Sequence, residues 1–194
     1  MSLDLEFHIS ETVSALKKGS ILNFPSDTRW GFACSLDNHS GIHKLKNLQS
    51  NKGQKLHTLL VCDEFMLKKF VSKIHPRVDT LLHYYQRSLT VVHNDTMHLP
   101  ANLLPETDKI GFRMVRNQFC EAVIHDLGTA LYFLPHHLSR LQRPAESPEY
   151  HQLVDHEVPE ECYDPLEERN SRIVSYDQKG MLIFHTEFNE APSA

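Results

Sequence analysis

The most constraining feature of this sequence is a regular alternation between short apolar runs and longer segments with a helical period. A continuous apolar run such as residues 57–62 is typical of a buried strand. In residues 39–48, Ile42, Leu45 and Leu48 share one helical face. Strands are predicted at residues 20–24, 57–62, 89–93, 109–115, 129–134, 172–176 and 181–186, and helices at 11–18, 39–48, 63–71, 76–86 and 117–127. This alternation predicts an α/β fold with a parallel or mixed sheet.

Punctuating residues mark where these elements begin and end. Ser10 and Asp63 are predicted helix caps, and Gly128 is expected to end the helix before it. We expect one domain over residues 1–194, with an ordered core at about 10–186, a long loop region at 135–170 and a tail at 187–194. The sequence has neither a membrane-length apolar run nor a secretory leader pattern, so a cytoplasmic protein without a membrane partner is expected.

Charge and cysteine usage narrow the classes of function. The formal net charge is −5, which weighs against a dedicated nucleic-acid binder. Residues 38–62 contain no acid, and within them residues 44–55 are the only basic candidate surface for RNA, whereas residues 144–169 carry nine acids. The four cysteines form no Cys-x-x-Cys pair, so reduced thiols are expected.

Residues 25–32, Pro-Ser-Asp-Thr-Arg-Trp-Gly-Phe, form the sharpest local feature and follow the first predicted strand. A turn of this composition presents backbone N–H groups and two hydroxyls, which suit a carboxylate, an amine or a phosphate. The alternative is an ordinary turn in which Ser26 and Asp27 act as local caps.

Five segments together resemble the YrdC-like family of threonylcarbamoyl-AMP synthases (the TsaC and YciO type). Residues 25–34 resemble its Pro-Thr-Asp-Thr-Val-Tyr-Gly-Leu-x-Cys signature, and Ile-Gly-Phe-Arg-Met at 110–114 resembles its Val-Gly-Val-Arg-Val strand. Residues 42–48, 88–91 and 171–174 match further family segments in the same order, so the resemblance covers about residues 10–186.

The resemblance implies a twisted mixed sheet with helices on its faces and a concave cavity. It also implies synthesis of threonylcarbamoyl-AMP from threonine, bicarbonate and ATP with Mg²⁺, for modification of tRNA adenosine 37, and in some members binding of double-stranded RNA. By the same resemblance the substrate-binding residues are Ser26, Thr28, Trp30, Arg113 and Ser171, and the nucleotide-binding residues are Lys52, Lys55 and His137. No catalytic residue is assigned.

The chain departs from the family where the reaction needs cations. The family's Lys-x-Arg falls on Gln49-Ser50-Asn51, and its Ser-Thr-Ser-Ala-Asn falls on residues 133–137, where the hydroxyls are missing. A reaction that gathers phosphate and carboxylate charge depends on fixed cations, so impaired or altered catalysis is predicted. Compensation is the alternative, from Arg29, Lys52, Lys55, Arg113 and Arg116.

Two other classes of function stay open beside the enzyme. One is a non-catalytic paralogue that binds a nucleotide or double-stranded RNA, and the other is a regulatory interaction protein. The pairs His136-His137 and His93-x4-His98 do not have metal-binding spacing on a strand or a loop, so no protein-bound metal is predicted.

Overall fold

The computed structural model describes residues 3–50, 56–103, 109–136, 152–164 and 171–185. The helices are α1 (Leu3–Lys17), α2 (His39–Ser50), α3 (Glu64–Phe70), α4 (Pro76–Tyr84) and α5 (Gln118–Leu127), with short 3₁₀ turns η1 (Ala101–Leu103) and η3 (Glu160–Cys162). The strands are β1 (Leu22–Pro25), β2 (Trp30–Ser35), β3 (Leu56–Val61), β4 (Leu89–Val92), β5 (Lys109–Met114), β6 (Leu131–Pro135), β7 (His156–Glu157), β8 (Arg172–Tyr176) and β9 (Leu182–His185).

One mixed sheet organises these strands, in the order β7-β1-β2-β6-β3-β5-β4-β8-β9. The pairs β3–β5, β4–β8 and β1–β7 are parallel, and the remaining neighbours are antiparallel. The predicted α/β class with a twisted mixed sheet is therefore confirmed. None of the helices in the described ranges combines the length and apolar character that a membrane crossing requires.

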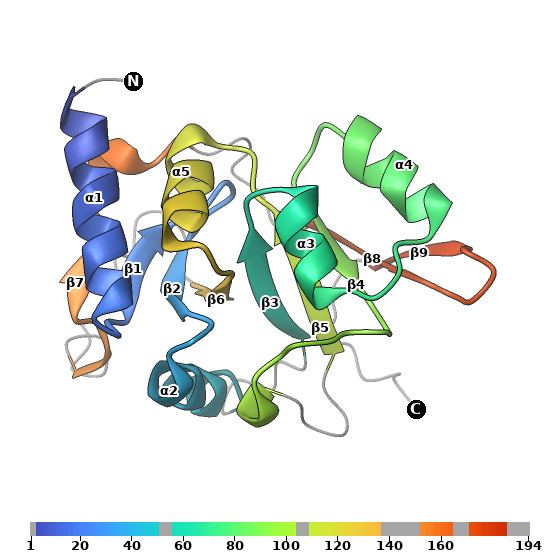
Figure 1. Cartoon of the computed structure of the whole chain (residues 1–194), viewed down its shortest axis with the longest axis horizontal. Coiled ribbons are helices and arrows are strands. Elements are labelled where there is room, and N and C mark those ends of the chain that lie inside the picture. Colours follow the sequence, from blue (N-terminus) through green and yellow to red (C-terminus); the bar gives the residue numbers. More distant parts are fainter. Residues whose placement is uncertain (1–2, 51–55, 104–108, 137–151, 165–170, 186–194) are drawn as a thin grey trace.

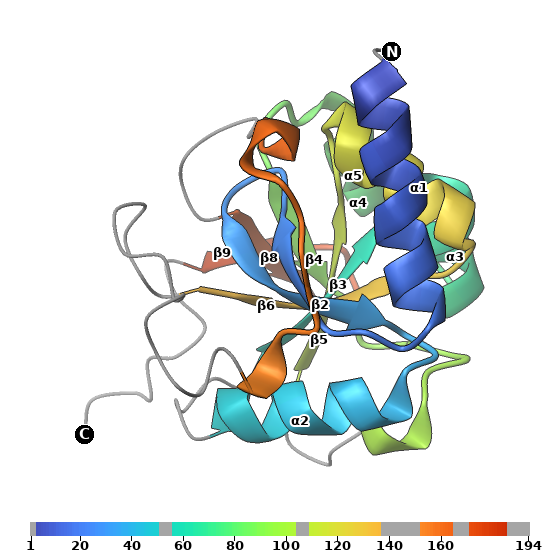
Figure 2. The same ribbon diagram turned by 90° about the vertical axis from the view of Figure 1, so that its left-hand side faces the viewer.

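The helices lie mainly on one side of the sheet. Figure 1 shows α1 beside α5, and α3 beside β3 and β5, while α2 lies across one end. The side view in Figure 2 places α1, α5 and α3 together on one side of the strands. Phe70 of α3 stacks on Phe112 of β5, with ring centroids 6.0 Å apart. Because successive strand residues face opposite sides, Arg113 next to Phe112 points to the sheet face away from α3.

The structure differs from the sequence expectations in three places. First, α1 begins at Leu3, so Ser10 lies inside the helix and is not its cap. Second, residues 30–35 form the buried strand β2, where the sequence suggested only a loop. Third, residues 152–164 contain β7 and η3, because Asp155 accepts a hydrogen bond from the Ile21 backbone at 2.8 Å and so aligns the segment with β1. The predicted caps at Asp63 and Gly128 are confirmed.

The turn between β8 and β9 packs against the start of α4. Gly180 has a φ of 74°, which lies in the left-handed region that favours glycine. A Cβ at this position would come within 2.0 Å of the His75 ring. His75 in turn caps α4, since its Nδ1 accepts from the Arg77 backbone at 3.2 Å. The β8–β9 turn therefore packs closely against the N-terminal cap of α4.

His93 is the buried histidine of this region and is 3% exposed. Its Nδ1 lies 2.9 Å from the Tyr176 hydroxyl, and its ring packs edge-on against Phe112. Desolvation lowers the pKa of His93 from 6.5 to about 4. The neutral ring is therefore the form that the fold accommodates.

We expect acid to destabilise the protein through His93. The unfolded chain takes up this proton near pH 6.5 and the folded chain only near pH 4, so the stabilisation is complete above 6.5 and is lost as pH falls toward 4. The loss is roughly 3 kcal/mol. Urea unfolding at several pH values should show a flatter dependence for His93→Phe than for wild type. The same change at exposed His43 is the control, and equal slopes for both variants would contradict this origin.

Candidate functional site

The turn between β1 and β2 is held in place by its own hydroxyl groups. Ser26 Oγ donates to the Arg29 carbonyl at 2.6 Å and accepts from the backbone N–H groups of Thr28 and Arg29 at 3.3 and 3.2 Å. It also lies 3.1 Å from Thr28 Oγ1. The local-cap interpretation of Ser26 is therefore realised in the structure. The cap also fixes Thr28, which faces another element.

Arg113 reaches this turn from β5. Two strands, β6 and β3, separate β2 from β5, a gap of about 14 Å between strand axes. The Arg113 side chain crosses much of this gap, with its guanidinium carbon 5.2 Å from the Phe133 ring centroid of β6. Its Nη1 donates to Thr28 Oγ1 at 2.8 Å. The resemblance grouped Ser26, Thr28 and Arg113 in one site, and the structure brings these three side chains together.

Asp27 completes the link between the turn and β5. Its Oδ1 lies 3.3 Å from Arg113 Nε in an ion pair, and its Oδ2 accepts from Ser88 Oγ at 3.0 Å. Asp27 is fully buried and Arg113 is 4% exposed. The sequence interpretation treated Asp27 only as a local cap and gave it no role in the site. Asp27 pairs with Arg113, which lies 86 residues later in the sequence, and no local pattern predicts such a contact.

Part of this ion pair is left without hydrogen bonds. Among the described residues, Arg113 Nη2 and Nε and Asp27 Oδ1 are buried and have no hydrogen-bond partner. The Nε to Oδ1 contact is close enough for charge attraction but does not form a hydrogen bond. Buried polar atoms in folded proteins are nearly always satisfied. The ion pair therefore keeps two unsatisfied donor atoms on Arg113 and one unsatisfied acceptor atom on Asp27.

A hydroxyl pair borders Arg113 on the same face of the sheet. Thr90 is directly opposite Arg113 in the β4–β5 ladder, and its Oγ1 lies 2.7 Å from Ser171 Oγ. Ser171 is thus placed beside the site through Thr90. Gly111, two residues before Arg113 and on the same face, makes room for the Thr90 side chain, since a Cβ there would meet Thr90 Cγ2 at 2.6 Å.

Trp30 lies at the edge of the turn and contacts the segment that follows β7. The ring centroids of Trp30 and Tyr163 are 5.5 Å apart. The Tyr163 hydroxyl also donates to the Thr28 carbonyl at 3.0 Å. Tyr163 was not predicted as a site residue, because residues 135–170 show no periodicity from which its position could be derived.

Arg29 and Arg116, the other arginines that could replace the missing family cations, bind backbone carbonyls. Arg29 Nη1 donates to the His136 carbonyl at 3.3 Å, and Arg116 Nη2 donates to the Leu82 carbonyl at 2.6 Å, at the last turn of α4. Lys52, Lys55 and His137 lie outside the described residues, so their predicted role in nucleotide binding stays a prediction.

Gln49, which the resemblance places at the family's lysine position, belongs to a buried network on the other side of the sheet. Its Nε2 donates to the Leu56 carbonyl at 2.6 Å, and its Oε1 lies 2.6 Å from Tyr132 Oη and 2.8 Å from His57 Nδ1. Tyr132 precedes Phe133, over which Arg113 stacks, so the two rings face opposite sides. Gln49 therefore does not contribute its amide to the Arg113 site.

The cysteine nearest the site is a structural thiol. Cys120 Sγ donates to the Pro25 carbonyl at 3.0 Å and is completely buried. Burial, followed by the charge of Asp27, raises the pKa of the Cys120 thiol well above its usual value. All four cysteines are free thiols, as expected. A protonated, enclosed thiol steadies the end of β1 and is a poor nucleophile.

Strand order and the turn-to-β5 site together define a mixed α/β domain of the YrdC type. A family model described as Sua5_yciO_yrdC, telomere recombination, matches residues 14–162. The match covers most of the chain, and the chain belongs to the Sua5/YciO/YrdC family. The resemblance drawn from residues 25–34 and 110–114 is confirmed. No curated protein matches the chain in sequence.

Solved structures of low sequence identity share the fold. E. coli YciO is 16% identical with a TM-score of 0.71, and the match covers 94% of this chain and 90% of YciO. P. abyssi Sua5 complexed with L-threonine is 16% identical with a TM-score of 0.65, covering 88% and 51%. Full-length HypF in a phosphate- and nucleotide-bound form is 14% identical with a TM-score of 0.71, covering 91% and 28%. The chain spans about half the length of Sua5.

Breaking the buried ion pair should cost much more stability than losing an exposed carboxylate. Asp27→Asn leaves the Arg113 charge buried without its counter-ion, so we expect the free energy of unfolding to fall by about 3–5 kcal/mol. Asp37→Asn, at an exposed position, is the matched control and should change it by less than about 0.5 kcal/mol. Urea unfolding of both variants measures the difference. A loss below about 1 kcal/mol for Asp27→Asn would mean that Arg113 is neutralised elsewhere.

Proposed function

We propose that this protein binds a small amino acid, with threonine the leading candidate, at the Asp27–Arg113 pair, and that it is a threonylcarbamoyl-AMP synthase-like protein with impaired or altered catalysis. The observation that carries the proposal is the buried Arg113 Nη2, which has no hydrogen-bond partner among the described residues. The family membership gives the wider context, and the Sua5 structure with L-threonine is the related complex.

The chemistry of the unpaired atoms fits a zwitterion. A guanidinium N–H is the preferred partner of a carboxylate, and Arg113 Nη2 offers that donor. The neighbouring Asp27 Oδ1 offers an acceptor for an ammonium group. The two side chains carry opposite charges, so their sum is zero. A ligand that also carries both charges replaces lost water contacts without leaving a net charge buried.

Pre-organisation supports the same conclusion. Ser26 fixes the turn, Thr28 binds Arg113 Nη1, and Ser88 holds the second oxygen of the Asp27 carboxylate. Each unpaired atom is therefore already oriented by its neighbours. Binding to fixed groups costs less conformational entropy than binding to mobile side chains. The nearby hydroxyl pair of Thr90 and Ser171 offers further contacts for a hydroxylated side chain.

Impaired or altered catalysis is proposed because the arginines near the site already have protein partners. Arg113 is already paired with Asp27, Arg29 and Arg116 bind backbone carbonyls, and Gln49 lies in a separate network. ATP and Mg²⁺ remain implied by family membership, and the lysines predicted for the phosphates lie outside the described residues. Without additional cations, the charge gathered around a reacting phosphate is poorly stabilised.

Calorimetric titration of the full-length protein with L-threonine tests ligand binding. We expect Arg113→Lys to weaken binding on the order of tenfold, because the ammonium lacks the planar fork. Thr90→Val should weaken binding less and keeps the ion pair intact. Arg116→Lys is the matched control, since Arg116 contacts the Leu82 carbonyl away from the site.

Two ligand analogues sharpen the titration. Threonine methyl ester lacks the carboxylate and should lose binding through Arg113, whereas serine keeps both charged groups and should still bind. Equal affinity of the wild type for threonine and its methyl ester, or unchanged affinity in Arg113→Lys, would remove Arg113 as the anchor. Circular dichroism of each variant separates a lost contact from a lost fold.

Pyrophosphate release tests the catalytic part separately. With ATP–Mg²⁺, threonine and bicarbonate, we expect release on the order of a thousandfold slower than in a relative that keeps both family cations. Lys52→Glu combined with Lys55→Glu should abolish any residual release if these lysines contact phosphate. Release as fast as in such a relative would overturn the proposal of impaired catalysis and leave the threonine proposal intact.

A further inference from the structure

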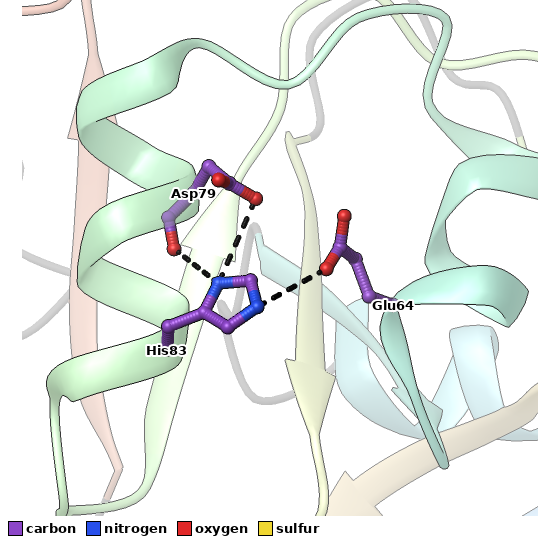
Figure 3. Close-up of side chains that lie close together, drawn as sticks. All are labelled: Glu64, Asp79 and His83. Carbon is purple, nitrogen blue, oxygen red and sulfur yellow. Dashed lines mark hydrogen bonds and ion pairs between the residues drawn. The ribbon is translucent and has the colours of Figure 1, made fainter.

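A cluster of three metal-ligating side chains joins α3 and α4, outside the site described above. Glu64 begins α3, and Asp79 and His83 lie one turn apart on α4. One ligand atom of each residue lies within 4.8 Å of the other two. Figure 3 shows the His83 ring between the Asp79 and Glu64 carboxylates. Because α3 packs on the Phe112 side of the sheet, this cluster and the Arg113 site lie on opposite faces.

Hydrogen bonding defines which ring nitrogen of His83 is available. The Asp79 backbone carbonyl lies 2.9 Å from His83 Nδ1. A carbonyl only accepts, so Nδ1 carries the proton and donates to it. The Nε2 atom faces Glu64 Oε2 at 3.4 Å. A metal-binding histidine usually has this arrangement: one ring nitrogen binds the metal, and the other donates its hydrogen to a carbonyl or carboxylate oxygen.

The distance between Nε2 and Oε2 fits a shared metal ion better than a hydrogen bond. An N–H···O bond is about 2.7–3.2 Å long, and this contact is longer at 3.4 Å. Two ligands at about 2.0–2.1 Å from a tetrahedral zinc lie roughly 3.3 Å apart. The Asp79 carboxylate, whose Oδ1 lies 3.7 Å from His83 Nδ1, is the third ligand within reach of the cluster.

We propose that Glu64, Asp79 and His83 form a binding site for a zinc-type divalent transition metal that clamps α3 to α4. The nitrogen and carboxylate ligands suit zinc better than calcium, which prefers oxygen alone. The side chain of Glu64 is 26% exposed and that of His83 is 55% exposed, so the ion is open to solvent and water completes its coordination. The helices have only seven and nine residues and gain stability from a cross-link, since helices this short are marginal alone.

The sequence alone does not group these three residues, for a clear reason. Asp79 and His83 have the i, i+4 spacing of a helical ligand pair, but Glu64 lies 15 residues earlier and joins them only when α3 and α4 pack. Lys68 makes an ion pair with Glu64 Oε1 and competes for the same carboxylate. Removing Lys68 should therefore strengthen metal binding, an effect opposite in sign to that of losing a ligand.

Calorimetric titration of the full-length protein with Zn²⁺, with Co²⁺ absorbance as a second probe, tests the proposal. We expect one ion per chain at this site, with affinity reduced at least about tenfold in each of His83→Ala, Glu64→Gln and Asp79→Asn. Lys68→Ala should raise the affinity a few-fold. The matched control is His125→Ala. His125 is exposed and contacts Asp126 at 3.1 Å, and no third ligand joins this pair among the described residues, so this variant should bind as wild type does.

Thermal unfolding with and without Zn²⁺ gives a readout of the clamp itself. Wild type and His125→Ala should melt at higher temperature with Zn²⁺, and His83→Ala should not, because an ion that binds only the folded state stabilises it. All these side chains are partly or largely exposed, so the variants are expected to fold. Absence of Zn²⁺ binding, or wild-type affinity in any one of the three ligand variants, overturns the three-ligand site. Neither result bears on threonine binding at Arg113.

Discussion

The buried ion pair between Asp27 and Arg113 is the interaction on which the polar face of this sheet depends. It connects the β1–β2 turn to β5 across two intervening strands, and both side chains are almost completely removed from water. Two charges are costly to bury unless their geometry and hydrogen bonds compensate for lost hydration. Thr28 and Ser88 supply part of that compensation, and the atoms left unpaired concentrate the remaining cost at one place. A ligand that satisfies those atoms, as proposed above, would relieve this cost.

Much of the fold followed from periodicity, and the misses have physical causes. The alternating strands and helices, and the caps at Asp63 and Gly128, are local features that a sequence expresses directly. Strand β2 was missed because its residues continue a turn rich in polar groups and then become fully buried without alternation. Strand β7 has two residues, and its place depends on Asp155 pairing with a backbone N–H more than a hundred residues away. Long-range contacts of this kind leave no local period.

The site was foreseen only in part for the same reason. Resemblance to the family singled out Ser26, Thr28 and Arg113, and their proximity is visible in the structure, while their ligand remains proposed. The role of Asp27 was hidden, since a carboxylate in a turn looks like a cap until its partner is located. Tyr163 was hidden by the irregular segment around it. Gln49 looked like a lost cation, yet its amide joins His57 and Tyr132 in a buried network on the other side of the sheet.

Charge balance explains why substrate binding and catalysis can separate in such a domain. A neutral Asp27–Arg113 pair can recognise a zwitterion, because each ligand charge meets an opposite charge at short range. A polyphosphate needs net positive potential over a larger area, and that must come from cations beyond this pair. Among the described arginines near the turn, Arg29 binds a carbonyl and Arg116 supports α4. The proposed amino-acid recognition would therefore depend on contacts within the described sheet and turn, whereas phosphate chemistry would need cations beyond this pair. The two properties can be lost or retained independently.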